Sequence, residues 1–292
     1  MSRRAYDEIT RSTLVGRSAT IARVDPARYV VDARDPRAPS QAVWERLSEA
    51  ERRRIVVALP SEFPSAAPPE GDPHWDEKRH VREALDEYFR RIKRRVYLSC
   101  ELPIYYPDEP VFAPDLIAVC DVELHERMGW VVSAERRGLD LALEIHASGD
   151  ARKDFVLNVV RYARLGIPEY FAYDIGKRRL AGWRLAERGG TYVPIIPQEG
   201  RWRSDVLDLE LALDEVGLRF FHGSAVLPDA RELIARLSGM IDDAIRRAEE
   251  ASRRAEDESR RAEDESRRAE DESRRADALG AKLRALGVDP DA

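Results

Sequence analysis

The chain has 292 residues, enough for one core of roughly 150 to 200 residues with additional segments. Its formal net charge of −6 excludes a globally basic nucleic-acid binder but is compatible with a local basic cleft. Two cysteines are too few for a disulfide scaffold, and no apolar run approaches the roughly 18 residues of a membrane span. The N-terminal arginines are not followed by the apolar stretch of a signal peptide, so we expect a cytoplasmic protein that does not enter a membrane.

The first part of the chain predicts two helices. Residues 1–59 are predicted to be an N-terminal extension with one helix over residues 40–59, where apolar residues recur at roughly helical spacing. Residues 60–73 are rich in Pro, Ser and Ala and predict a loop. A second helix is predicted to run to about residue 95, with Asp72 as its cap and Pro73 in its first position. Its polar side chains are expected on a solvated face: His74, His80, Glu83 and Glu87.

Two acidic residues then interrupt apolar runs that predict buried strands. Asp115 lies in residues 112–122, and Glu144 lies in residues 139–147. A carboxylate in a buried strand is costly unless it is paired or binds a metal. Because hard cations such as Mg²⁺ prefer carboxylate oxygens, two such residues on consecutive strands predict a divalent-cation site built on a sheet.

The remaining elements alternate between strands and one more helix. Residues 95–106 predict a strand with a break near Pro103, and residues 154–165 predict an amphipathic helix that ends at Gly166. Further strands are predicted at residues 169–174, 179–185, 192–196 and 207–221. This order predicts an α/β core with a central mixed sheet flanked by helices.

The segment around the two acids resembles the Uma-type family of bacterial endonucleases. The resemblance covers roughly residues 60–220 and is most specific in the block from Asp154 to Asp174. The positions that match the family in type and spacing are Asp115, Glu144, Asp154, Tyr162, Gly166, Glu169, Tyr170 and Asp174. Because the family is similar to the PD-(D/E)XK nucleases, the resemblance implies a restriction-endonuclease-like core and metal-dependent hydrolysis of phosphodiester bonds. In nucleases of this class an acid of the first helix can join the site, which is the alternative to a solvated face for Glu83 and Glu87.

One position departs from the family. Asn158 stands where the family has a lysine, which is expected to stabilise the charge that develops on the phosphate. Lys153, in the turn before the same helix, is one candidate for the missing cation. His146 is another, because it lies two residues after Glu144 and alternation along a strand points both side chains to one face. Alternatively, His146 is a hydrogen-bonded strand residue, and the loss of lysine indicates a slow or inactive nuclease.

The C-terminal part of the chain is repetitive. Residues 246–273 repeat with a seven-residue period, but the candidates for a coiled-coil seam are alanine and serine, which bury little apolar area. Opposite charges four residues apart, such as Glu256 and Arg260, favour a long solvated helix. Residues 229–292 are therefore predicted to form a charged helix or weak coiled coil. The apolar residues that can dock or support a homodimer are Leu233, Leu237, Met240 and Ile241.

The acid pair and the resemblance together predict a metal-dependent DNA endonuclease in residues 60–228. Asp115 and Glu144 are the predicted ligands of Mg²⁺ or Mn²⁺, and His146 and Lys153 are the predicted assisting catalytic residues. Candidate phosphate contacts are Arg152, Arg161 and Arg164. The alternative is a catalytically inactive nuclease-fold protein that binds or scaffolds partners through its helical tail, which the departure from the family lysine favours.

Overall fold

The computed structural model describes residues 29–62, 71–186 and 190–285. The chain divides into two compact units, residues 1–227 and residues 228–292. The first 28 residues of the predicted extension, and most of the predicted loop at residues 60–73, lie outside the described part. None of the helices in the described part is both long and apolar enough to cross a membrane.

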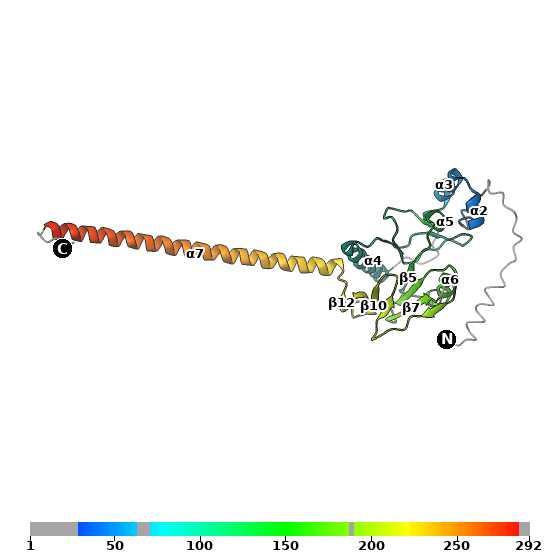
Figure 1. Ribbon diagram of the computed structural model, residues 1–292. Helices are drawn as coiled ribbons and strands as arrows, with labels where there is room; N and C mark the ends of the chain where they lie inside the picture. The colour runs from blue at the N-terminus through cyan, green and yellow to red at the C-terminus, as the bar shows by residue number, and fades with distance from the viewer. Residues whose placement is uncertain (1–28, 63–70, 187–189, 286–292) are drawn as a thin grey trace. The chain divides into compact units, whose positions relative to one another are not determined.

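A mixed six-stranded sheet forms the centre of the first unit (Figure 1). Its strands, in the order of their hydrogen-bonded neighbours, are β1 (Val96–Ser99), β3 (Leu116–Cys120), β5 (Leu141–His146), β6 (Glu169–Asp174), β7 (Arg179–Leu185) and β8 (Tyr192–Pro194). β5 and β6 run parallel, and every other neighbouring pair is antiparallel. The predicted α/β class with a central mixed sheet is confirmed.

Two smaller sheets accompany the central one among the described residues. A four-stranded antiparallel sheet has the order β12 (Ala225–Val226), β11 (Leu218–His222), β10 (Leu209–Leu213) and β9 (Trp202–Ser204). β2 (Ile104–Tyr105) pairs in parallel with β4 (Trp130–Val131). The predicted break near Pro103 therefore separates β1 from β2, and the strand segment predicted at residues 207–221 contains two strands, β10 and β11. The short strands β4, β9 and β12 were not predicted.

Helices cover both faces of the central sheet. On one face, α4 (Asp72–Ile92) packs Val81 and Leu85 into an apolar cluster that also includes the four-stranded sheet. On the other face lie η2 (Lys153–Leu157), a π-helical turn, and α6 (Asn158–Arg164). A short helix, α5 (Val132–Glu135), follows β4.

Two helix predictions need correction at the N-terminal ends. α4 begins at Asp72 with proline in its first turn, but Gly71 rather than Asp72 is its N-cap. The helix predicted over residues 154–165 begins with a π-helical turn, in which the Asn158 N–H bonds to the Lys153 carbonyl. Gly166 ends α6 with a φ of +75°, as predicted.

The helix predicted over residues 40–59 is in fact two helices. They are α2 (Gln41–Arg46) and α3 (Glu49–Ala58). The chain breaks at Ser48, because its side chain forms a capping box with Glu51 that starts a new helix. Apolar residues of both helices pack with Tyr105 and Val131 of the small parallel sheet. This segment is therefore part of the first unit's packing.

The second unit contains one continuous helix, α7 (Ala230–Ala285), of 56 residues (Figure 1). The predicted long charged C-terminal helix is confirmed. Ion pairs three or four residues apart, such as Arg246 with Asp243 and Arg253 with Glu249, follow its surface. Association of α7 as a coiled coil stays a prediction.

Candidate active site

Asp115 and Glu144 are neighbours across two strands of the central sheet. Asp115 lies in a bend immediately before β3, so its predicted place inside the strand is wrong by one residue. Leu116 pairs with Leu143 in the antiparallel β3–β5 ladder, which brings Asp115 opposite Glu144. Side chains alternate between the two faces along a strand. The residues two positions from each acid toward the strand interior belong to the apolar cluster beneath α6, so both acids lie on the face that α6 covers.

The Glu144 side chain is held by neutral donors in a buried position. Only 3% of Glu144 is exposed. Its Oε1 accepts hydrogen bonds from the Tyr162 hydroxyl at 2.6 Å and from Asn158 Nδ2 at 3.1 Å. Burial, followed by the negative charge of Asp115, raises the pKa of Glu144 well above its usual value, although Lys153 and the Tyr162 hydrogen bond oppose the shift. The ionised form of Glu144 is therefore only partly compensated.

The Asp115 carboxylate is engaged at both of its oxygens. Oδ2 accepts a hydrogen bond from the Ile145 backbone N–H at 2.6 Å, and Oδ1 lies 3.2 Å from His74 Nε2. His74 belongs to the first turn of α4. The prediction that it faces solvent is wrong, because the start of α4 meets the bend before β3, a tertiary contact that helical periodicity cannot reveal.

The π-helical turn η2 brings a lysine and a third acid to the site. Lys153 Nζ lies 3.8 Å from Asp154 Oδ1, and the charge of Glu144 is the largest cause that raises the pKa of Lys153. Asp154 is buried, and burial is the main cause that raises its pKa. His146 Nδ1 lies 3.2 Å from Asp154 Oδ2. His146 is therefore a partner of Asp154, and Lys153 lies near Asp154 and lines the same cavity as Glu144.

Asn158 occupies the space between two acids. Its Nδ2 lies 3.1 Å from Glu144 Oε1 and 3.5 Å from Asp154 Oδ1, and the side chain is buried. The position at which the resemblance predicts a lysine thus faces the acids, but it carries a neutral amide.

A cavity of about 450 Å³ adjoins these residues. Glu144, Lys153 and Asn158 line it, together with Arg161 and Tyr162. Asp115 and His146 are not among the described residues that line the cavity. Of the four predicted catalytic residues, the structure therefore brings Glu144 and Lys153 to the cavity and places the other two beside it.

The sequence matches a family model described as "Putative restriction endonuclease", Uma2, over residues 44–229, more than half of the chain. The chain belongs to the Uma2 family. Its fold is similar to that in the "Crystal structure of a putative nuclease belonging to DUF820 from Anabaena variabilis ATCC 29413", at 12% identity, a TM-score of 0.38, and coverage of 58% of this chain and 91% of that chain. Among curated proteins, none matches this sequence. Membership of the Uma2 family supports a nuclease role.

The arginines predicted to contact phosphate are partly committed elsewhere in this Uma2-family chain. Arg161 Nε lies 3.1 Å from Glu109 Oε1, and Arg164 reaches both oxygens of the same carboxylate at 2.8 Å. Arg161 also lines the cavity, whereas Arg164 is not part of its described lining. The exposed Arg152 lies at the N-terminal end of η2.

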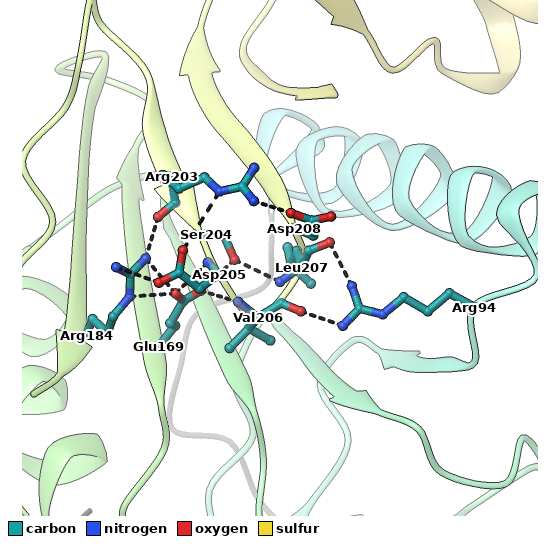
Figure 2. Close-up of polar contacts among 9 residues, drawn as sticks. All are labelled: Arg94, Glu169, Arg184, Arg203, Ser204, Asp205, Val206, Leu207 and Asp208. Atoms are coloured by element: carbon teal, nitrogen blue, oxygen red, sulfur yellow. Dashed lines mark hydrogen bonds and ion pairs between the residues drawn. The ribbon is translucent and has the colours of Figure 1, made fainter. Parts of the chain in front are cut away.

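A second buried glutamate that matches the family lies at the start of β6. Figure 2 shows Glu169 within a group of donors. It accepts hydrogen bonds from Arg184 Nε at 2.9 Å, from Ser204 Oγ at 2.5 Å and from the Asp205 backbone N–H at 2.8 Å. Ser204 is in β9 and Arg184 is in β7, so this cluster ties the four-stranded sheet to the central one. Glu169 has a structural role.

Other family-matching residues support the site from neighbouring positions. The Tyr170 hydroxyl donates to the Asp154 carbonyl at 2.7 Å. Asp174 pairs with His146 in the parallel β5–β6 ladder and accepts a hydrogen bond from the Lys177 backbone N–H at 2.9 Å. These contacts fix the ends of η2 and β6 around the acids.

The donor chemistry of the site fits a hard divalent cation. Asp115 and Glu144 present neighbouring negative charges, and the second acid has a raised pKa because of its burial and its neighbour. Within the described residues, no group of three or more His, Cys, Asp or Glu side chains is arranged to hold a metal ion. Since Mg²⁺ commonly takes one or two protein carboxylates and completes its shell with water and phosphate, two carboxylates are sufficient.

Proposed function

We propose that this protein is a metal-dependent DNA endonuclease whose active site is built around Asp115 and Glu144. The observation that carries the proposal is their juxtaposition on adjacent strands and on one face of the sheet, beside a lysine. Family membership supports the same proposal, because the family model is described as a restriction endonuclease.

Asp115 and Glu144 would hold Mg²⁺ or Mn²⁺, with water and substrate phosphate as the remaining ligands. When bound, such an ion lowers the pKa of a coordinated water and polarises the phosphate. Glu144 is a ligand only in its deprotonated form, so its raised pKa couples metal binding to release of a proton. Tyr162 and Asn158 both donate to Oε1, which fixes the orientation of the carboxylate.

Lys153 is proposed to stabilise the negative charge that develops on the phosphate. It lines the cavity, and 67% of its side chain is exposed, so its ammonium group can reach a bound substrate. His146 is proposed to act indirectly, because its ring is paired with Asp154. Lys153 thus takes the role that a lysine at position 158 takes in the family.

The test is nicking of supercoiled plasmid DNA in the presence of Mg²⁺ or Mn²⁺. Asp115→Asn and Glu144→Gln are expected to abolish cleavage without unfolding the protein, because both replacements remove the negative charge but keep the shape of the side chain and one acceptor oxygen. Glu215→Gln removes an exposed carboxylate away from the site and serves as the matched control. Cleavage at the wild-type rate by either site variant would contradict the proposal.

The second candidate function is that of a catalytically inactive binding or scaffold protein. The neutral Asn158 between Glu144 and Asp154 favours it. It predicts no cleavage by the wild-type protein and no Mn²⁺ binding by calorimetry. The nuclease proposal predicts that the wild-type protein cleaves DNA and binds Mn²⁺.

A further inference from the structure

We propose that His74 is a positioning residue of the active site, which holds the Asp115 carboxylate in the orientation that binds the metal ion. The inference rests on the proposed function, because it assigns Asp115 the role of metal ligand. It adds a histidine from α4, which the sequence pattern assigns to a solvated face.

The first step is the contact itself. His74 Nε2 lies 3.2 Å from Asp115 Oδ1, and the side chains are only 16% and 13% exposed. The other oxygen, Oδ2, accepts the Ile145 N–H at 2.6 Å. A carboxylate held at one oxygen can rotate about that contact, whereas two contacts on two oxygens define its plane. His74 therefore removes the remaining rotational freedom of Asp115.

The second step is the direction of approach. α4 packs against one face of the central sheet, through Val81 and Leu85. Tyr162, which holds Glu144, packs in the cluster on the opposite face. His74 belongs to α4 and Tyr162 to α6, so the two acids of the pair are held by helices that pack on opposite faces of the sheet.

The third step is that α4 supports a second acid in the same way. Lys78 lies one helical turn after His74, so the two side chains share one face of the helix. Lys78 is buried, and its Nζ lies 2.8 Å from Glu101 Oε1. Glu101 lines the cavity that Glu144 also lines. One face of α4 thus holds two carboxylates at this end of the sheet.

Outer-shell partners orient the ligands of metal sites, and their removal typically costs about 10- to 100-fold in metal affinity. We therefore expect His74→Ala to weaken Mn²⁺ binding by about that factor. His74→Gln places an amide N–H near the position of Nε2 and is expected to retain affinity close to that of the wild type. His74→Asn is polar but too short to reach Asp115, and is expected to behave like the alanine variant.

The experiment is calorimetric titration of the full chain with Mn²⁺, supported by the electron paramagnetic resonance signal of the free ion and by melting temperatures in EDTA. His80→Ala is the matched control, since His80 lies on the same helix and interacts electrostatically with Glu77. If the alanine variant does not fold, the Gln and Asn variants decide the question. Mn²⁺ binding by His74→Ala or His74→Asn that equals or exceeds the wild-type affinity overturns the inference.

Asp115→Asn separates this inference from the proposed function. If the wild type binds no Mn²⁺, or if Asp115→Asn binds it as well as the wild type, the proposed metal site fails and the role of His74 fails with it. If Asp115→Asn loses binding while the His74 variants keep it, only the inference about His74 fails. If Asp115→Asn and His74→Ala both lose Mn²⁺ binding, and His74→Gln retains it, the result supports the proposed metal site and the role of His74.

Discussion

Glu144 and Glu169 are buried glutamates on two neighbouring parallel strands, and their surroundings are opposite in character. Glu169 receives hydrogen bonds from a guanidinium, a hydroxyl and a backbone N–H (Figure 2). Glu144 receives only neutral side-chain donors and lies beside Asp115, whose charge opposes its ionisation. The same residue type is therefore compensated in one strand and left partly uncompensated in the next.

The difference shows how a carboxylate that maintains the fold can be distinguished from one that binds a ligand. A buried charge that has a cationic partner and satisfied oxygens stabilises a fixed arrangement. A buried acid placed beside another acid has an electrostatic cost that a bound cation can relieve, and such perturbed groups concentrate at functional sites. Both glutamates match the family pattern, so the pattern alone does not separate the two roles.

The largest effect on stability is expected when the compensated cluster is broken. Glu169→Ala should lower the free energy of unfolding by about 3 kcal/mol, because it removes the buried carboxylate that Arg184 pairs with and leaves the fully buried Ser204 hydroxyl without its acceptor. Urea denaturation measures this change. Glu169→Gln retains an acceptor and should cost less than the alanine variant. A loss below about 1 kcal/mol would show that the Glu169 cluster does not make the expected contribution to the stability of the fold.

The next largest effect concerns the cation beside Glu144. Lys153→Ala should reduce plasmid nicking by about 100-fold, since it removes one transition-state contact. Asn158→Lys should change the wild-type rate little but restore cleavage to the Lys153→Ala variant, because position 158 faces Glu144 and Asp154. His146→Ala serves as the comparison and should be less impaired than Lys153→Ala. A stronger loss in the His146 variant would reverse the two assigned roles.

A smaller effect, opposite in sign to that at Glu169, is expected for Glu144→Gln without metal. Because the pKa of Glu144 is higher in the folded protein than its usual value of 4.5, the folded state binds this proton more tightly than the unfolded chain. Stability from this group is therefore present at low pH and decreases as the pH rises from about 4.5 through the raised pKa. Glu144→Gln should flatten that decrease.

At neutral pH in EDTA, Glu144→Gln should raise the melting temperature by about 2–4 °C, equivalent to roughly 1 kcal/mol. Melting temperatures across the pH range measure both the slope and the shift. A lower melting temperature for Glu144→Gln would show that the charge of Glu144 is compensated after all, like that of Glu169.

The smallest effect is expected from deletion of residues 246–292. The ion pairs in this part of α7 are exposed, such as Arg260 with Asp257, and such pairs contribute roughly 0–1 kcal/mol. The melting temperature of the first unit should therefore stay unchanged after the deletion. In the intact chain, the helical signal of the tail should weaken with added salt. A first unit that fails to fold after the deletion would contradict this assignment of stability to buried clusters.

Local sequence pattern was sufficient to predict much of the fold. The apolar runs around Asp115 and Glu144 predicted β3 and β5, and the strand predicted at residues 169–174 coincides with β6. The charge spacing of the tail predicted α7. These elements depend on side chains close together in sequence, which is why their spacing carries the information.

The partners of the two glutamates follow from tertiary structure. Ser204 meets Glu169 across 35 residues of chain, and His74 of α4 contacts Asp115, which precedes β3. No periodicity encodes such contacts, because they arise only when separate elements pack. Composition and spacing therefore revealed the acids and the strands that carry them. The charge around each acid, and with it the contrast between Glu144 and Glu169, depends on which side chains the packed sheets and helices bring within hydrogen-bonding distance.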